Sequence, residues 1–323
     1  MMKKATKIWL IVATSLVVAG LSLFVGVMIA LEWDFAELST VEFETNEYEI
    51  SDSYQGISIK TDTADVVFLP SEDGKTTSIV CYESVKETHR IEVKDGTLII
   101  ELIDTRNWYD YIGIHVGSPK ITVYLPRGEY GALTLKGSTG NIEIPGDMVF
   151  ESMDMAVSTG DVTCKASASG TVKIKAGTGD ICVENVTAEK LALSVSTGKI
   201  TASGITVAED VAVSVSTGKS YLTDVACKNF TSTGNTGDIT VKNVIVAEKM
   251  SIERSTGDVR FDGCDAAEID VITDTGDVTG TLCSEKMFIP KSDTGDIQVP
   301  ESRTGGLCKI TTDTGDIRIS YAK

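Results

Sequence analysis

The chain has 323 residues, of which 42% are hydrophobic and only six are proline, and its formal net charge is −18 with a pI near 4.5. This composition excludes a disordered chain and predicts one or two ordered domains. The acidic charge also argues against nucleic acid and anionic lipid surfaces as partners, because most of the protein would repel phosphate groups.

Residues 8–31 contain no charged side chain and exceed the roughly 20 residues that a helix needs to cross a bilayer. Three lysines precede this segment, and acidic residues follow it from Glu32 onward. The positive-inside rule therefore predicts a single-pass anchor in the cell membrane with a cytoplasmic N-terminus and an extracytoplasmic remainder. A signal peptide cleaved at Ala30 is the alternative, but the length of the apolar stretch favours an uncleaved anchor. We assign residues 1–32 to the cytoplasmic tip and anchor.

We predict that residues 33–130 form an N-terminal β region that caps one end of the following repeats, since a terminal repeat must be covered. Strand-like runs occur at 76–84, 89–104 and 120–126, and Asp95-Gly96 is typical of a hairpin turn. Residues 56–70 fit the template of the later repeats, which makes them a candidate first coil.

An aromatic insertion, "DTRNWYDYIG", interrupts the predicted strands of this region. Its Trp108, Tyr109 and Tyr111 are expected to form a small hydrophobic cluster beneath a loop. Binding of carbohydrate or protein by these rings is the alternative interpretation.

Residues 131–323 consist of repeats aligned on a Thr-Gly pair. Successive pairs are separated by 19 or 20 residues, which is the range of a solenoid in which each repeat forms one coil. The ten threonines are Thr139, Thr159, Thr178, Thr197, Thr217, Thr236, Thr256, Thr275, Thr294 and Thr314.

Within each period the apolar residues alternate, which indicates strands and leaves no helical face. The second and fourth residues after each glycine, and pairs such as Leu191 and Leu193 before each threonine, are expected to point inward. The predicted fold is all-β: a parallel β-solenoid of 19–20-residue coils, each with two strands and two turns.

The triplet Asp-Thr-Gly also carries the catalytic carboxylate of aspartic proteases. Here it recurs along one predicted edge, whereas a protease needs two such loops that converge on one cleft. The residue after glycine is usually Asp but becomes Asn141, Lys199 and Lys219, which a catalytic carboxylate would not tolerate. A turn role explains the motif, because glycine supplies positive φ and its neighbours satisfy backbone groups. We predict no catalytic residues and no enzyme activity.

The last three Asp-Thr-Gly-Asp coils are expected to place like charges in adjacent rungs, where Ca²⁺ would relieve their repulsion. The spacing differs from that of known calcium rolls, and water or salt can also screen such charges. The candidate ligands are Asp274, Asp277, Asp293, Asp296, Asp313 and Asp316. No other cofactor is expected.

Seven cysteines lie far apart and two histidines, His89 and His115, have no ligand-like spacing, so a zinc site is not indicated. Most thiols are expected to act as small buried side chains. Cys264 and Cys283 each follow a glycine by seven residues, so they should be stacked neighbours, either as a disulfide or as two packed thiols.

The segments "ISIKTDTADVVFLP", "DGTLIIEL" and "ITVYLPRGEYGALTLKGSTGNIEI", with the "STGDV" and "DTGDI" units, resemble the bacterial putative adhesin family of β-strand repeat proteins of unknown function. The resemblance covers most of the chain after the membrane segment. It implies a right-handed β-solenoid ectodomain with an adhesive or envelope-associated role. It supplies no catalytic residues, and some relatives imply a regulatory role in envelope stress.

We therefore expect a membrane-anchored, extracytoplasmic scaffold or adhesin that binds an envelope component or a protein. A calcium-binding solenoid and a glycan-active β-helix enzyme are the alternatives. The segment "DIRISYAK" follows the last repeat without a cap, so we expect it to form an open edge at the C-terminal solenoid end that pairs with a partner or a second copy.

Overall fold

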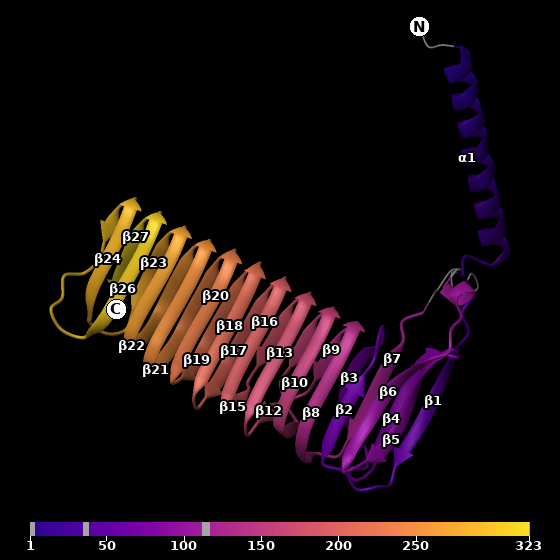
Figure 1. Ribbon diagram of the computed structural model, residues 1–323, viewed down its shortest axis with the longest axis horizontal. Coiled ribbons are helices and arrows are strands. Elements are labelled where there is room, and N and C mark those ends of the chain that lie inside the picture. Colours follow the sequence, from indigo (N-terminus) through magenta and orange to yellow (C-terminus); the bar gives the residue numbers. More distant parts are fainter. Residues whose placement is uncertain (1–3, 35–38, 112–116, 323) are drawn as a thin grey trace.

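The computed structural model describes residues 4–34, 39–111 and 117–322. One helix, α1 (Lys4–Ala30), stands apart from a long β structure (Figure 1). Its segment Thr6–Ala30 is long and apolar enough to cross a membrane, with a mean hydropathy of 2.4, and of its described side chains only Met28 is buried. The prediction of a single apolar N-terminal helix is thus confirmed.

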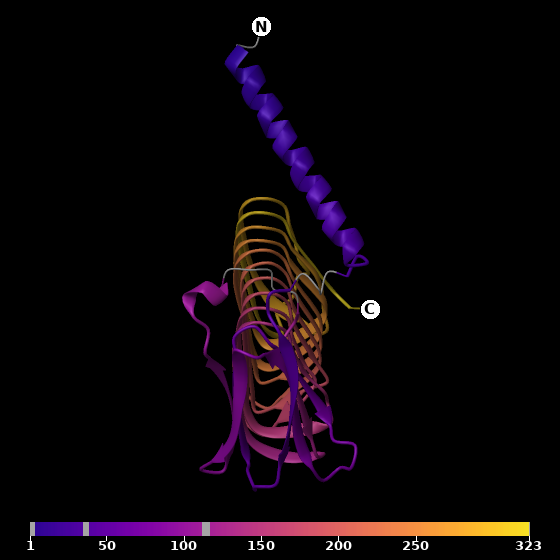
Figure 2. The same ribbon diagram turned by 90° about the vertical axis from the view of Figure 1, so that its right-hand side faces the viewer.

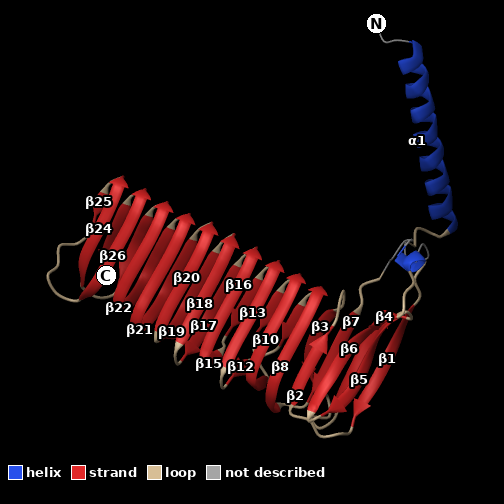
Figure 3. Ribbon diagram, in the orientation of Figure 1, coloured by secondary structure: helices blue, strands red, loops and turns tan. Residues whose placement is uncertain are grey.

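The β structure is a solenoid of about ten turns, as the 19–20-residue period predicts. Figure 3 shows strands along its whole length, and Figure 2 shows the coils stacked behind one another. Neighbouring coils pair in parallel with equivalent residues opposite each other; Thr178, for example, lies opposite Thr159 and Thr197. One continuous cluster of buried side chains fills the interior.

Two long ladders of strands run the length of the solenoid. In spatial order the first contains β5 (Glu87–Lys94), β6 (Thr97–Asp104), β2 (Gly56–Lys60), β8 (Gly128–Thr139), β10 (Met148–Thr159), β13 (Thr171–Thr178), β16 (Lys190–Thr197), β18 (Asp210–Thr217), β20 (Asn229–Thr236), the second parts of β21 (Ile239–Thr256) and β22 (Val259–Thr275), β26 (Gly306–Thr314) and β24 (Lys286–Thr294). The Thr-Gly turns connect it to the second ladder.

The second ladder contains, again in spatial order, β1 (Phe43–Ile50), β4 (Thr77–Ser84), β7 (Lys120–Leu125), β3 (Asp65–Pro70), β9 (Ile142–Ile144), β11 (Val162–Cys164), β14 (Ile181–Glu184), β17 (Ile200–Val207), β19 (Ser220–Cys227), the first parts of β21 and β22, β23 (Val278–Leu282), β27 (Ile317–Tyr321) and β25 (Ile297–Gln298). The N-terminal end is closed by β1, β4 and β5, which pair antiparallel with their neighbours.

A third, shorter ladder occupies the polar turn between the second ladder and the first. It includes β12 (Ser167–Ala168) and β15 (Thr187–Ala188), and it continues through the ends of β17, β19, β21 and β22. The chain enters it through a residue with φ of 54–65°, which is Asn185, Gly204, Asp224, Asn243 or Gly263 in successive coils. Each of these coils therefore has three strand segments rather than the two that alternation alone predicts.

Residues 56–70 form a coil that stacks directly on the coil of β8 and β9, as their fit to the repeat template predicts. A further parallel rung, β6 and β7, lies outside it. Parallel stacking therefore extends upstream of residue 131. The Asp95-Gly96 hairpin between β5 and β6 is confirmed, with φ of 48° and 74° at its two residues.

At the far end the order of the rungs departs from the order of the chain. The last strands in the sequence, β26 and β27, lie between the rung of β22 and β23 and the rung of β24 and β25. The expectation that "DIRISYAK" forms the open edge is therefore wrong, because β27 has neighbours on both sides. The outermost rung is 286–298, and its inward-facing Ile297 is 45% exposed.

The expected stacking of Cys264 on Cys283 is also incorrect. The register between β22 and β23 shifts after Phe261, so that Leu282 rather than Cys283 lies opposite Cys264. Cys264 is buried and Cys283 is exposed, and both thiols are free. The shift follows a β-bulge, which the regular spacing of the sequence does not reveal.

Candidate functional site

The Thr-Gly edge is the most regular surface of the molecule, and the sequence motifs lie on it. The ten turn glycines have φ between 125° and 155°, a region that other residues rarely adopt. At Gly160 a Cβ atom would overlap the carbonyl oxygen of Gly140 in the previous coil. Glycine is required here twice, for the turn itself and for the close approach of stacked backbones.

The Asp or Asn that follows most of these glycines takes part in a ladder of hydrogen bonds along this edge. Asp180 donates its backbone N–H to Asp161 Oδ1 at 2.7 Å, and Asp161 donates its own to Asn141 Oδ1 at 2.9 Å. The same bond recurs from Asn141 to Asp65, from Lys199 to Asp180, from Asp258 to Asp238, from Asp277 to Asp258, from Asp316 to Asp277 and from Asp296 to Asp316. The carboxylates thus serve the coil stack itself, as the interpretation of this motif as a turn predicts.

Two lysines interrupt the ladder, and each forms an ion pair with the carboxylate of an aspartate in an adjacent coil. Lys199 Nζ lies 3.2 Å from Asp180 Oδ2, and Lys219 Nζ lies 2.9 Å from Asp238 Oδ2. The hydrogen bond from Lys219 lowers the pKa of the Asp238 carboxyl group. Residues that depart from the motif therefore pair with the residues that keep it.

The six calcium candidates lie in two columns on this edge. Asp277, Asp316 and Asp296 follow one another in that spatial order, so Asp277 and Asp296 are not neighbours as expected. Asp316 also binds Arg318 at 2.5 Å, and Asp293 binds Lys291 at 3.0 Å. The other column runs in the order Asp274, Asp313 and Asp293, and all three are exposed. Calcium binding stays a prediction.

A buried polar network in the cap was missed by sequence reasoning. His89 Nδ1 lies 2.7 Å from Glu83 Oε2, and His89 Nε2 lies 3.0 Å from the hydroxyl of Thr61. Asn46 donates to Glu83 Oε1 at 2.9 Å. One group of three potential metal-ligand atoms within 4.8 Å of one another occurs among the residues that the structure describes, and it consists of Cys81, Glu83 and His89.

The order hydroxyl, imidazole, carboxylate is that of a catalytic relay, but the network is enclosed. Thr61 is 8% exposed, His89 4% and Glu83 1%, so a substrate does not reach the hydroxyl. Burial raises the pKa of the Cys81 thiol to about 12, which disfavours the thiolate that a metal needs. The antiparallel pairing of β4 with β5 brings Glu83 close to His89, whereas Thr61 follows the end of β2 and Asn46 comes from β1. The spacing in the sequence gives no signal for this arrangement. His115 lies outside the described residues.

The aromatic insertion is not a small core beneath a loop. It contains a short 3₁₀ helix, η2 (Trp108–Tyr111), whose Trp108 is 77%, Tyr109 54% and Tyr111 57% exposed. Trp108 and Tyr109 contact each other edge to face, and Tyr111 lies against the Arg106 guanidinium, 4.5 Å from the ring centre. The expectation of a buried aromatic cluster is therefore wrong.

The fold and its turn ladder define a protein of the parallel β-solenoid class. The chain matches the Toastrack DUF4097 family over residues 54–218 and 206–323, and it belongs to this family. The resemblance to bacterial β-strand repeat proteins of unknown function is thereby confirmed. No curated protein matches the chain.

Several solved structures resemble this fold at low sequence identity. The putative adhesin from Parabacteroides merdae is 14% identical, with 76% of this chain and 96% of that chain covered and a TM-score of 0.49. The putative adhesin from Parabacteroides distasonis is 12% identical, with coverage of 85% and 97% and a TM-score of 0.47. A putative lipid binding protein from the same species is 15% identical, with coverage of 86% and 97% and a TM-score of 0.47.

Proposed function

We propose that this chain is a single-pass membrane protein whose solenoid lies outside the cytoplasm and serves as an adhesin-like scaffold for envelope components or proteins, without catalysis. The observation that supports it best is the joining of a largely exposed apolar helix to a regular parallel solenoid. The most repetitive polar motif of that solenoid is engaged in its own hydrogen bonds. What remains for partners is the long outer surface of the strands.

The topology is tested with the exposed thiol of Cys283. A membrane-impermeant maleimide applied to intact cells is expected to label the natural chain and to leave the chain with both Cys283→Ser and Cys182→Ser unlabelled, because the other five thiols are buried. The mass of the labelled chain shows whether residues 1–30 remain attached. Labelling only after lysis would contradict an extracytoplasmic solenoid.

Binding is tested by photo-crosslinking from Tyr221, which lies on β19 and is 38% exposed. A photoreactive residue at this position in intact cells is expected to form an adduct with an envelope component, and the natural chain is the matched control. If neither this position nor other exposed strand positions yield adducts in a folded protein, the scaffold role fails.

Calcium binding is the second candidate function, and it rests on the ladder of Asp277, Asp316 and Asp296. Each of these carboxylates lies in a column of like charge about 4.8 Å from the next rung, where a divalent cation would reduce repulsion. Roles in envelope stress regulation and in glycan cleavage have no comparable support from the described residues. Self-association was expected at the C-terminal end of the solenoid. The open edge there is formed by β24 and β25, so we propose these strands as the place where a second copy would pair.

A further inference from the structure

The aromatic loop, defined here as residues 105–111, presents the largest exposed rings of the cap. Polar contacts within the loop and with neighbouring residues hold its conformation. Asp110 accepts the backbone N–H of Asn107 at 2.8 Å and pairs with Lys86. Arg106 binds Glu87 at 2.7 Å and Asp104 at 2.8 Å. Rings that are held rigidly in water have an energetic cost, which a partner surface would remove.

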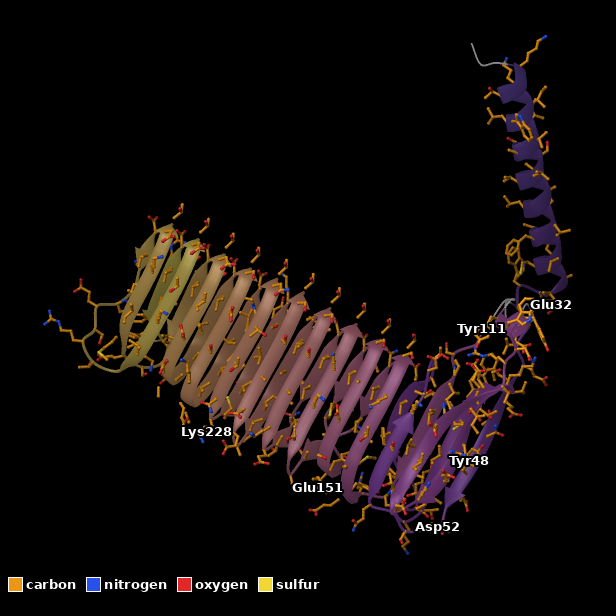
Figure 4. All side chains as sticks on the ribbon, in the orientation of Figure 1. Glu32, Tyr48, Asp52, Tyr111, Glu151 and Lys228 are labelled. Carbon is orange, nitrogen blue, oxygen red and sulfur yellow. The ribbon has the colours of Figure 1, made fainter. Side chains whose placement is uncertain are left out.

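The loop lies beside the segment that leads to the membrane helix. Thr40, Val41 and Glu42 line one cavity of about 240 Å³ together with Tyr109 and Asp110. Figure 4 places Tyr111 on the side of the cap that faces α1, where Glu32 also lies. Figure 1 shows the short helix of this loop at the same end of the β structure as the foot of α1, and Figure 2 shows the two on opposite sides of the cap.

The chain between the helix and the loop is short. Nine residues lie between Ala30, the last residue of α1, and Thr40, so the cavity lies within roughly 36 Å of the helix end even when the connection is fully extended. Trp33 is the third residue after the end of the helix and is 55% exposed. With α1 in a bilayer, the aromatic loop is therefore within reach of the outer headgroup region.

We propose that the aromatic loop seats the cap on the outer surface of the bilayer that holds α1, with Trp108 and Tyr109 in the headgroup interface. Tryptophan and tyrosine are enriched at this depth because their rings are apolar while their N–H and O–H groups need water. The two cations of the loop region are already paired with acids, so the rings rather than basic charge make the contact. The partner is a phospholipid interface that includes zwitterionic lipid.

This inference rests on the anchor in the proposed function, and the experiment separates the two. The full chain with Trp9→Phe and Trp33→Phe, which keeps Trp108 as its single tryptophan, is reconstituted in phosphatidylcholine vesicles that contain brominated phosphatidylcholine. The positive control keeps Trp33 alone, through Trp9→Phe and Trp108→Phe. The negative control combines all three Trp→Phe substitutions with Tyr221→Trp on the solenoid.

Trp108 emission is expected to shift to shorter wavelength and to be quenched by brominated lipid to nearly the same degree as Trp33 emission. If Trp33 is quenched while Trp108 behaves like the Tyr221→Trp control, the inference is overturned and the anchor stands. If Trp33 is not quenched either, the anchor and the inference both fail. Vesicles with added phosphatidylglycerol are expected to give no stronger quenching of Trp108, and a requirement for that lipid would contradict a ring-based contact.

Discussion

The turn glycines carry two constraints at single residues, a positive φ and a backbone approach that leaves no room for a Cβ atom. Asp and Asn at the next position satisfy the N–H of the adjacent coil, which explains why Asn141 replaces Asp without breaking the ladder. The lysine positions show the limit of the rule, since Lys199 donates its backbone N–H to Asp180 Oδ1 but offers no acceptor to the N–H of Lys219. At this scale the motif is a device for stacking coils.

Substitution of Gly218 by Ala is expected to destabilise the solenoid by roughly 1–3 kcal/mol or more, because strained φ adds to overlap with Gly198. Gly128→Ala is the matched control, since a Cβ at Gly128 meets no atom within 4 Å. Urea unfolding of both variants measures the difference. Equal stability of the two would contradict the close approach.

Substitution of Asp161 by Ala removes the acceptor for the Asp180 N–H and is expected to cost about 0.5–1.5 kcal/mol. Asp161→Asn keeps an acceptor oxygen at the same place, as Asn141 does, and should be close to neutral. Thermal unfolding of the two variants tests the ladder. A loss as large for Asn as for Ala would mean that charge rather than the hydrogen bond matters.

Thiol reactivity should differ sharply between cysteines. Cys283 is exposed, whereas burial raises the pKa values of Cys164, Cys227 and Cys308 to about 12. A thiol reagent is expected to modify Cys283 rapidly in the folded protein and all seven cysteines after denaturation. Fewer than seven reactive thiols in denaturant would reveal a disulfide that the structure does not contain.

At the scale of elements, the two ends of the solenoid are closed differently. Antiparallel strands β1, β4 and β5 close the N-terminal end. At the other end β24 and β25 form an outer rung whose inward layer is incompletely covered, with Phe288, Pro290 and Val299 partly buried. In inner coils the turn glycine donates its N–H to the next rung, as Gly160 does to Thr178, and Gly295 has no further rung to meet.

Hydrogen exchange should therefore not follow the order of the chain. Amides of β26 and β27, at 306–321, are expected to exchange more slowly than those of β24 and β25, at 286–298, because the former have neighbours on both sides. Mass spectrometry of peptides from these two segments measures the exchange rates. Protection that falls steadily toward residue 321 would contradict the inserted rung.

The aromatic loop should loosen in acid. Hydrogen bonds from Arg106 lower the pKa of the Asp104 carboxyl to about 2. A depressed carboxyl pKa gives stability that is complete above the unfolded value of about 3.8 and lost as pH falls through about 2. Trp108 fluorescence is expected to change over this range, and Asp104→Asn should remove the change. A titration with the same midpoint in the variant would point to another group.

At the scale of the whole molecule, the net charge of −18 on a rod with aligned carboxylates creates repulsion that salt reduces. Sodium chloride is expected to raise the melting temperature of the natural chain by a few degrees. Calcium that raises it at much lower concentration than magnesium, with the effect lost in Asp316→Asn, would indicate a specific site. Equal effects of calcium and magnesium on the melting temperature would mean that cations only screen the carboxylates and that no specific calcium site exists.

The repeat period, the inward columns and the apolar helix were predictable because they depend on residues close in sequence. Three features were not. The third ladder follows from positive φ at residues such as Asn185. The inserted rung depends on which open edge β26 pairs with, and the alternation of apolar residues is the same for either choice. The network of Thr61, Glu83 and His89 arises from contacts between strands distant in the chain. The Thr-Gly edge was predicted as a turn, but its hydrogen-bond ladder depends on contacts between stacked coils that a single repeat does not reveal.

The inserted position of β26 and β27 bears on how such rods change in length during evolution. A duplicated unit added after Tyr321 would begin beside a strand whose two edges are already occupied, so it would have to pass the rung of β24 and β25 before it met an open edge. New turns are accommodated only where chain order and rung order coincide, as between β10 and β20. Longer and shorter family members should accordingly differ by gains and losses in the middle of the rod, with both terminal arrangements inherited intact.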